Sequence, residues 1–174
     1  GANLREVNLK GADLYRADLS KANLEEVNFK GANLREVNLR EVNLKGANLY
    51  KVNLKGANLR EVNLKGAYLS KANLEEVNLK GANLREVNLK GANLHKANLK
   101  GADLRWADLD GADLSGADLD GADLSGTDLS SIKSYKDFLC YTEGIKESCP
   151  SRPIGAYGRQ RQKELIEQHQ IRPR

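Results

Sequence analysis

An apolar period of five residues runs through most of this 174-residue chain. A central Leu recurs at every fifth position from Leu4 to Leu129, and Phe29 is its one substitution. Two residues before it lies Ala or Val, until Thr127 takes that place in the last of 26 repeats. Side chains two residues apart point to the same face of an extended segment. The period therefore predicts one short strand with an apolar face in each repeat.

Neither a helix nor a long strand fits this period. Five helical steps of about 100° rotate each successive Leu by about 140°, so no apolar face forms, and a period of five breaks strand alternation. The two residues between apolar pairs are mostly charged or Gly, and Gly tolerates the positive φ of tight turns. A chain that turns the same way in each repeat coils into a solenoid around a continuous Leu core, with its coils paired as a parallel sheet.

The repeated A(D/N)LXX pattern, as in Ala-Asn-Leu-Lys-Gly, resembles the pentapeptide repeat proteins, many of which come from cyanobacteria. The resemblance implies an all-β solenoid, namely a right-handed quadrilateral parallel β-helix. The number of four repeats per coil also comes from the resemblance and not from the period. The 26 repeats then make about six and a half coils, and a rise of about 4.8 Å per coil gives a rod of roughly 31 Å. We assign the β-helix to residues 1–131 and a short α-helical cap with a basic tail to residues 132–174.

The predicted core is the row of central residues, represented by Leu4, Phe29, Leu64 and Leu129. Asn precedes the central residue in 17 of the 26 repeats. It is expected to stack with the Asn one coil away, each amide donating to its neighbour. After Lys100 this position is always Asp. Stacked Asp103 and Asp123 lack an amide donor and are expected to repel mildly.

The repeat ends near residue 131, and an apolar cluster at near-helical spacing follows. We expect it to cover the last coil through Ile132, Tyr135, Phe138 and Leu139. Cys140 and Cys149 are the only cysteines. Their spacing allows a disulfide that closes a small loop, or two inert thiols. Because the histidines are distant from them, no zinc site is expected.

Charge is distributed unevenly along the chain. Residues 1–100 carry 18 basic and 11 acidic groups, and residues 101–131 carry 1 basic and 8 acidic groups. The tail carries 9 basic and 5 acidic groups. At a spacing of twenty, the outer residues include a basic track that marks either an anion or nucleic-acid binding surface or a solvated face. It is formed by Arg40, Arg60, Lys80 and Lys100. The Asp-rich block invites a calcium hypothesis, although the family motif accepts Asp or Asn at these positions.

The sequence contains no phosphate-binding Gly loop, no cluster of metal ligands and no nucleophile beside a base, so we expect no enzyme and no cofactor. The predicted function is a rigid structural or protein-binding module with an unknown protein partner. The alternatives are a metal-binding or anion-binding rod and, from the resemblance, a DNA mimic that inhibits gyrase, although the basic residues 1–100 depart from the acidic surface of such mimics.

Further expectations concern partners and location. The aromatic residues are expected to be scattered over the sides, which argues against nucleic acid as a partner; they are Tyr15, Tyr50, Tyr68 and Trp106. No apolar run approaches the roughly 20 residues of a membrane span, and no signal peptide is visible, so we expect a cytoplasmic protein. The uncapped N-terminal end of the solenoid is expected to be frayed, truncated, or buried against a second copy in a homodimer.

Overall fold

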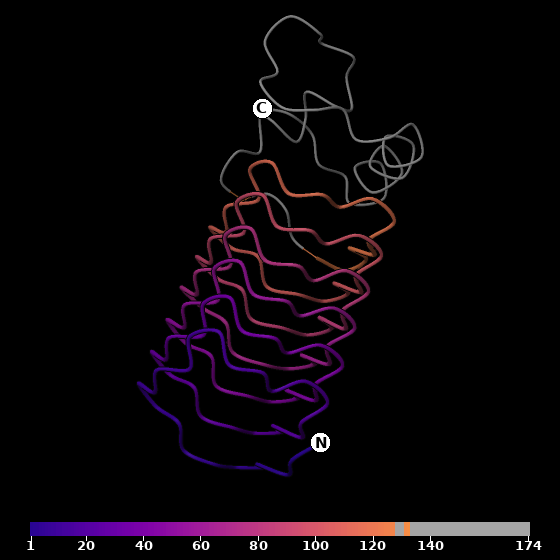
Figure 1. The fold of residues 1–174 in the computed structure, drawn as a ribbon. Helices are drawn as coiled ribbons and strands as arrows, with labels where there is room; N and C mark the ends of the chain where they lie inside the picture. Colours follow the sequence, from indigo (N-terminus) through magenta and orange to yellow (C-terminus); the bar gives the residue numbers. More distant parts are fainter. Residues whose placement is uncertain (128–130, 133–174) are drawn as a thin grey trace, which may run out of the picture.

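The computed structural model describes residues 1–127 and 131–132, which form a four-sided solenoid of stacked coils (Figure 1). Every backbone bridge is parallel and joins residues twenty positions apart, from Asn3 with Asn23 to Asp103 with Asp123. One coil is therefore twenty residues, or four repeats, and the four-sided prediction is confirmed. Residues 1–120 complete six coils, and the seventh begins at residue 121.

Each side of a coil is an isolated parallel bridge rather than a longer strand. The bridging residue is the one before the central Leu, which is Asn or Asp except at Tyr68, and a two-residue turn follows each Leu. The described residues contain no helix. The predicted helical cap falls on residues outside the described ranges, apart from its first member, Ile132.

The five-residue period is explained by the backbone hydrogen bonds, which satisfy every N–H group of a repeat. In the repeat 63–67, Asn63 donates to Val42 of the coil before, whereas Leu64 and Gly66 donate to the coil after. The N–H of Ala67 closes the turn by donating to the carbonyl of Leu64 at 3.0 Å. The remaining N–H, of the first turn residue, donates to the side-chain oxygen of Asn63 at 3.2 Å. Asn or Asp is thus needed before Leu because a shorter or apolar side chain leaves this N–H unsatisfied.

The second turn residue adopts positive φ in every described repeat. Twelve of these residues are Gly, and thirteen are not, with φ between 55° and 61°. Positive φ at the second of two central residues is the signature of a type II turn. The Gly preference read from the sequence is therefore correct, but the requirement extends to charged residues such as Glu61 and Lys71. The left-handed conformation costs each non-Gly residue about 1 to 2 kcal/mol of conformational energy.

The interior is filled by Leu from all four sides, with Ala or Val beside it. Phe29 and Leu64 are fully buried, as predicted. Leu4 is only partly buried, because it lies in the first coil and has no coil beneath it. Ile132 is also part of the core, whereas Leu129 is outside the described residues.

Candidate binding surfaces

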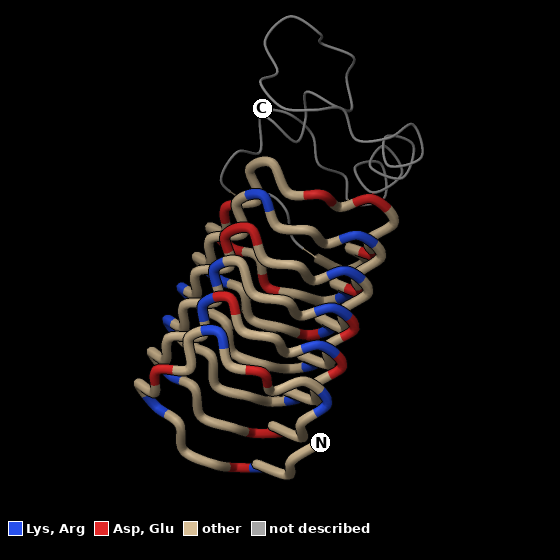
Figure 2. Tube along the Cα trace, viewed as in Figure 1, with Lys and Arg blue, Asp and Glu red and all other residues tan. Residues whose placement is uncertain are grey.

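The outward-facing turn residues gather at the four corners of the solenoid, where most of the charged residues lie (Figure 2). We number the corners in chain order. The first corner begins with residues 5–6, the second with 10–11, the third with 15–16 and the fourth with 20–21, and each continues every twenty residues. Backbone hydrogen bonds join successive turns of a corner, as from Gly81 N–H to the Lys100 carbonyl at 2.9 Å. Corner side chains therefore stack at a fixed coil-to-coil spacing.

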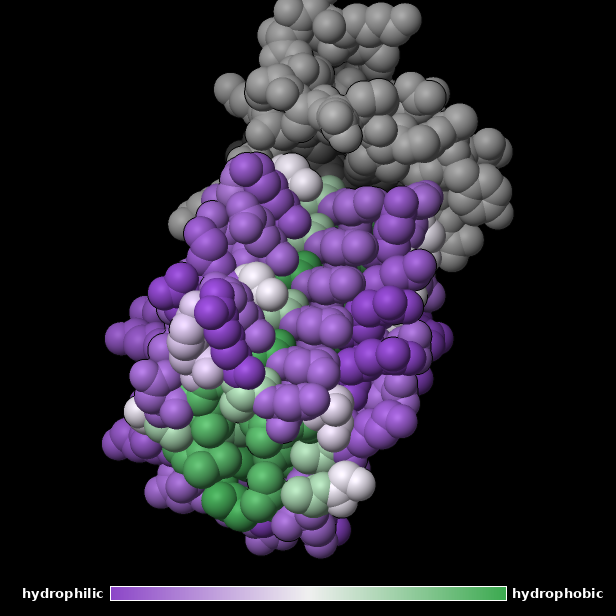
Figure 3. Space-filling view, viewed as in Figure 1, coloured by the Kyte–Doolittle hydropathy of each residue, from purple (hydrophilic) through white to green (hydrophobic). Residues whose placement is uncertain are grey.

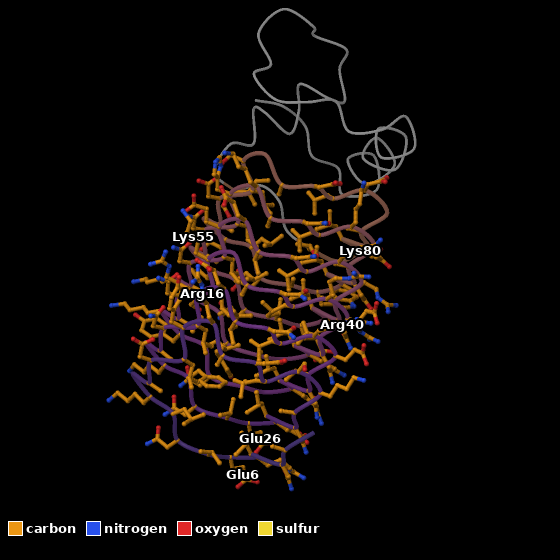
Figure 4. All side chains as sticks on the ribbon, in the orientation of Figure 1. Glu6, Arg16, Glu26, Arg40, Lys55 and Lys80 are labelled. Atoms are coloured by element: carbon orange, nitrogen blue, oxygen red, sulfur yellow. The ribbon has the colours of Figure 1, made fainter. Side chains whose placement is uncertain are left out.

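The predicted basic track lies on the fourth corner, where Figure 4 shows Arg40 below Lys80. Most of its cations face carboxylates. Arg40 is 2.9 Å from Glu41, and Lys100 is 3.3 Å from Asp118 and 3.9 Å from Asp120. Arg60 lies 3.8 Å from Glu61. The track therefore exists as a row, but its charge is largely compensated.

The second corner carries a more uniform row of exposed lysines, which the sequence prediction missed. We call it the lysine corner, and it consists of Lys10, Lys30, Lys51, Lys71 and Lys90. Within residues 1–127 and 131–132, only the last of these forms an ion pair, with Asp110 at 2.6 Å. The predicted track followed the first turn position alone, whereas Lys51 and Lys71 occupy the second. Examining both turn positions at a spacing of twenty would have found this row.

The predicted Asn ladder is present in part, with side-chain amide bonds between residues of the first four coils. Asn28 donates its side-chain amide to the side-chain oxygen of Asn8 at 3.1 Å, and Asn63 donates likewise to Asn43 at 3.1 Å. An Asp can accept from the Asn above it, as Asp13 does, but it cannot donate to the residue below. The change to Asp after Lys100 therefore removes the amide donor that a ladder needs. Each Asp from Asp103 to Asp123 still accepts the N–H of the first turn residue.

Tyr68 is the one described bridging residue that is neither Asn nor Asp. It has no side-chain acceptor for the turn that follows. The N–H of Ser70 consequently lacks the bond that the first turn residue makes in every other repeat from Arg5 to Ser125. Ser70 instead donates its hydroxyl to the side-chain oxygen of Asn88 at 2.7 Å. The phenol ring of Tyr68 projects from the side and is 58% exposed.

In the acidic block, Arg105 lies between two stacked carboxylates. Its guanidinium bonds Asp103 at 2.6 Å and lies 3.7 Å from Asp123. The hydrogen bond from Arg105 lowers the pKa of Asp103. The pKa of Asp123 is lowered mainly by Ser125, and proximity to Asp103 opposes that shift only weakly. The predicted mild repulsion is therefore outweighed by these partners. No group of three or more His, Cys, Asp or Glu in the described residues is arranged to hold a metal ion.

Trp106 is the largest exposed apolar side chain, with 65% of its surface accessible. It occupies the second turn position of the first corner at a φ of 61°. A Cβ atom placed on Gly126, one coil above, would lie 2.5 Å from Cε3 of the indole. The ring therefore packs over the turn of Gly126, which only a residue without a side chain permits.

The N-terminal end of the described solenoid is apolar and open, as the green surface in Figure 3 shows. The side chains of the first coil pack against the core but remain partly exposed, and they include Leu4, Val7, Leu9, Leu14, Ala17 and Leu19. This is the surface on which we predicted pairing of two copies. That pairing stays a prediction.

A family model for pentapeptide repeats, with eight copies, matches residues 1–31, 28–66, 67–105 and 97–133. The chain belongs to the pentapeptide repeat family. Membership supports the right-handed sense of the β-helix, and proteins of this family are generally structural or binding modules. No curated protein sequence is significantly similar to this pentapeptide repeat protein.

Several solved pentapeptide repeat structures are similar to it. HetL, involved in heterocyst differentiation regulation in the cyanobacterium Nostoc sp. strain PCC 7120, is 29% identical, with 76% of this chain and 86% of HetL covered and a TM-score of 0.35. Rfr23 from the cyanobacterium Cyanothece 51142 is 28% identical, with 76% of this chain and 88% of Rfr23 covered and a TM-score of 0.48. QnrB1, a plasmid-mediated fluoroquinolone resistance protein, is 18% identical, with 79% of this chain and 82% of QnrB1 covered and a TM-score of 0.47.

Three predictions for the C-terminal segment fall outside the described residues. They are the cap residues Tyr135, Phe138 and Leu139, the disulfide between Cys140 and Cys149, and the basic tail. Within the part of the chain that the structure describes, no helix has the length and hydrophobicity of a transmembrane span.

Proposed function

We propose that this pentapeptide repeat protein is a non-enzymatic, rigid module that binds a protein partner through the surface around Trp106. The exposed indole carries the proposal. Trp is enriched among the residues that dominate protein interfaces, and Arg105 beside it is of a second enriched type. Gly is the commonest residue at this turn position, and Trp adopts the same positive φ at a backbone cost of about 1 to 2 kcal/mol. Twelve other non-Gly residues bear the same backbone cost, so the exposed indole and not the strain distinguishes this position.

The proposal is tested by comparing proteins retained by three immobilised baits. Trp106→Gly restores the commonest turn residue, and relief of the left-handed strain offsets the lost packing of the indole over Gly126. Tyr68→Asn is the matched control, because it removes an exposed aromatic ring from another part of the solenoid. We expect quantitative mass spectrometry to show partners enriched on the wild type and on Tyr68→Asn but reduced at least tenfold on Trp106→Gly. Equal retention by all three baits would refute a role for Trp106.

Charge disfavours the alternative of a DNA mimic. A mimic of duplex DNA needs rows of carboxylates, whereas the lysine corner is cationic and the fourth corner pairs its cations with carboxylates. We therefore expect no inhibition when this protein is titrated into a gyrase supercoiling assay. Inhibition that persists at higher salt and with excess DNA would favour the mimic.

A further inference from the structure

The lysine corner has more uncompensated charge than its neighbours. Lys10, Lys30, Lys51 and Lys71 are exposed and have no ion-pair partner among the described residues. In the first five coils, the two sides that meet at this corner carry one acidic residue, Asp13. Its carboxylate accepts the side-chain amide of Asn33 at 2.9 Å. Like charges stacked on successive coils repel one another, so the row is complementary to a polyanion.

Two tyrosines lie beside these lysines, whereas Tyr15 lies at the third corner and Trp106 at the first. Tyr50 belongs to the lysine corner, and its ring has Lys30 and Lys51 at 5.5 and 5.4 Å from the centroid. Tyr68 bridges Asn48, which lies two residues before Tyr50 in the chain. The side chain of Tyr68 is mostly exposed, and Tyr68 is the one described bridging residue that is neither Asn nor Asp. A free aromatic face therefore borders the cationic row.

We propose that the lysine corner, together with Tyr50 and Tyr68, binds single-stranded nucleic acid. The phosphates lie along the lysines, and an unpaired base stacks on Tyr68. Five lysines on successive coils, about 4.8 Å apart, span roughly 19 Å, which is enough for several phosphates. Lysines act as point charges toward phosphates, and aromatic rings stack on any base, so the site is expected to bind without sequence preference. This inference goes beyond the protein-binding function and uses a different corner.

The lysines and tyrosines together favour a nucleic acid over an acidic polypeptide. An acidic polypeptide would pair with the lysines equally well, but it would gain nothing from the exposed ring of Tyr68. Duplex DNA fits less well than a single strand, because its bases already stack on one another and present no free face to Tyr68.

The test is fluorescence anisotropy of a labelled 20-nucleotide oligo-dT with the full chain, between 50 and 200 mM salt. Contact with about three or four phosphates predicts a slope of about −2 to −3 for log K against log salt. One variant changes the four unpaired lysines of the corner to Gln. A charge-matched control changes four cations of the fourth corner to Gln, namely Lys21, Arg40, Lys80 and Lys100.

We expect the lysine-corner variant to lose at least tenfold in affinity and the control less than threefold. Both variants keep the same basic residues beyond residue 132, so the tail cannot produce this difference. Equal losses in the two variants would overturn the proposal, because they would show that only net charge matters. Absence of measurable binding by the wild type at 50 mM salt would also overturn it.

Tyr68→Asn separates stacking from folding, because it restores the residue that the repeat ordinarily uses. The variant should keep or raise the melting temperature, since Asn can accept the N–H of Ser70. We expect its affinity for oligo-dT to fall by about fivefold to a hundredfold. Unchanged affinity would overturn the role of the ring. Displacement of the oligonucleotide by polyglutamate at an equal charge concentration would identify an acidic polypeptide as the ligand instead.

Discussion

Truncation of Leu64 to Ala tests the central feature of the fold, the stacked Leu interior. The side chain is fully buried. Removing three carbon atoms forfeits about 2.4 kcal/mol of transfer free energy at about 0.8 kcal/mol per group, and a residual cavity adds to this. The coils cannot close over the gap, because backbone hydrogen bonds of 2.7 Å from Leu44 to Asn63 and 2.8 Å from Leu64 to Asn83 fix their spacing. We expect a total loss of about 2 to 5 kcal/mol in the free energy of unfolding.

Leu4→Ala is a matched control, because Leu4 lies in the same column three coils away and is only partly buried. It leaves a gap at an open end instead of an enclosed cavity, so we expect a loss of about 1 kcal/mol or less. Urea unfolding, followed by Trp106 fluorescence and by circular dichroism, measures both. A loss below 1 kcal/mol for Leu64→Ala, or equal losses for the two variants, would refute the enclosed column.

Three further predictions follow from the turns and the acidic block. Glu61→Gly should raise the free energy of unfolding by about 0.5 to 1 kcal/mol, because relief of the left-handed penalty exceeds the added chain entropy of Gly; lower stability in urea would contradict it. Gly126→Ala should displace the indole of Trp106 and shift its fluorescence, and an unchanged spectrum would show that the ring lies elsewhere. Asp103 has a lowered pKa, so its ionised form stabilises the fold above the unfolded-state pKa near 4, and this contribution is lost as the pH falls through the lower folded value. Arg105→Gln should raise the pKa of Asp103 in an NMR titration and weaken this acid dependence, and an unchanged pKa would exclude Arg105 as its main cause.

Much of the candidate site could not be predicted from the residues alone. The fourth corner was recognised as a row of cations, but pairing with Glu41 and Asp118 depends on side-chain positions that spacing does not show. The lysine corner was missed because Lys51 and Lys71 occupy the second turn position. Tyr68 stands where the repeat has Asn or Asp, and its effect on the N–H of Ser70 depends on the hydrogen bonds of the folded turn.

The sequence by itself determined the architecture, because a strict period of five allows only one way to bury Leu: a turn in each repeat and a parallel solenoid. It also indicated where a ladder of side-chain amides can form, since Asn has an amide donor and the Asp residues after Lys100 have none. Only the tertiary structure decided that twenty residues make one coil and that Tyr50 lies beside Tyr68. Those relations depend on the angle that the chain turns at each corner, and that angle is set by the φ of the turn residues and by hydrogen bonds between residues about twenty positions apart.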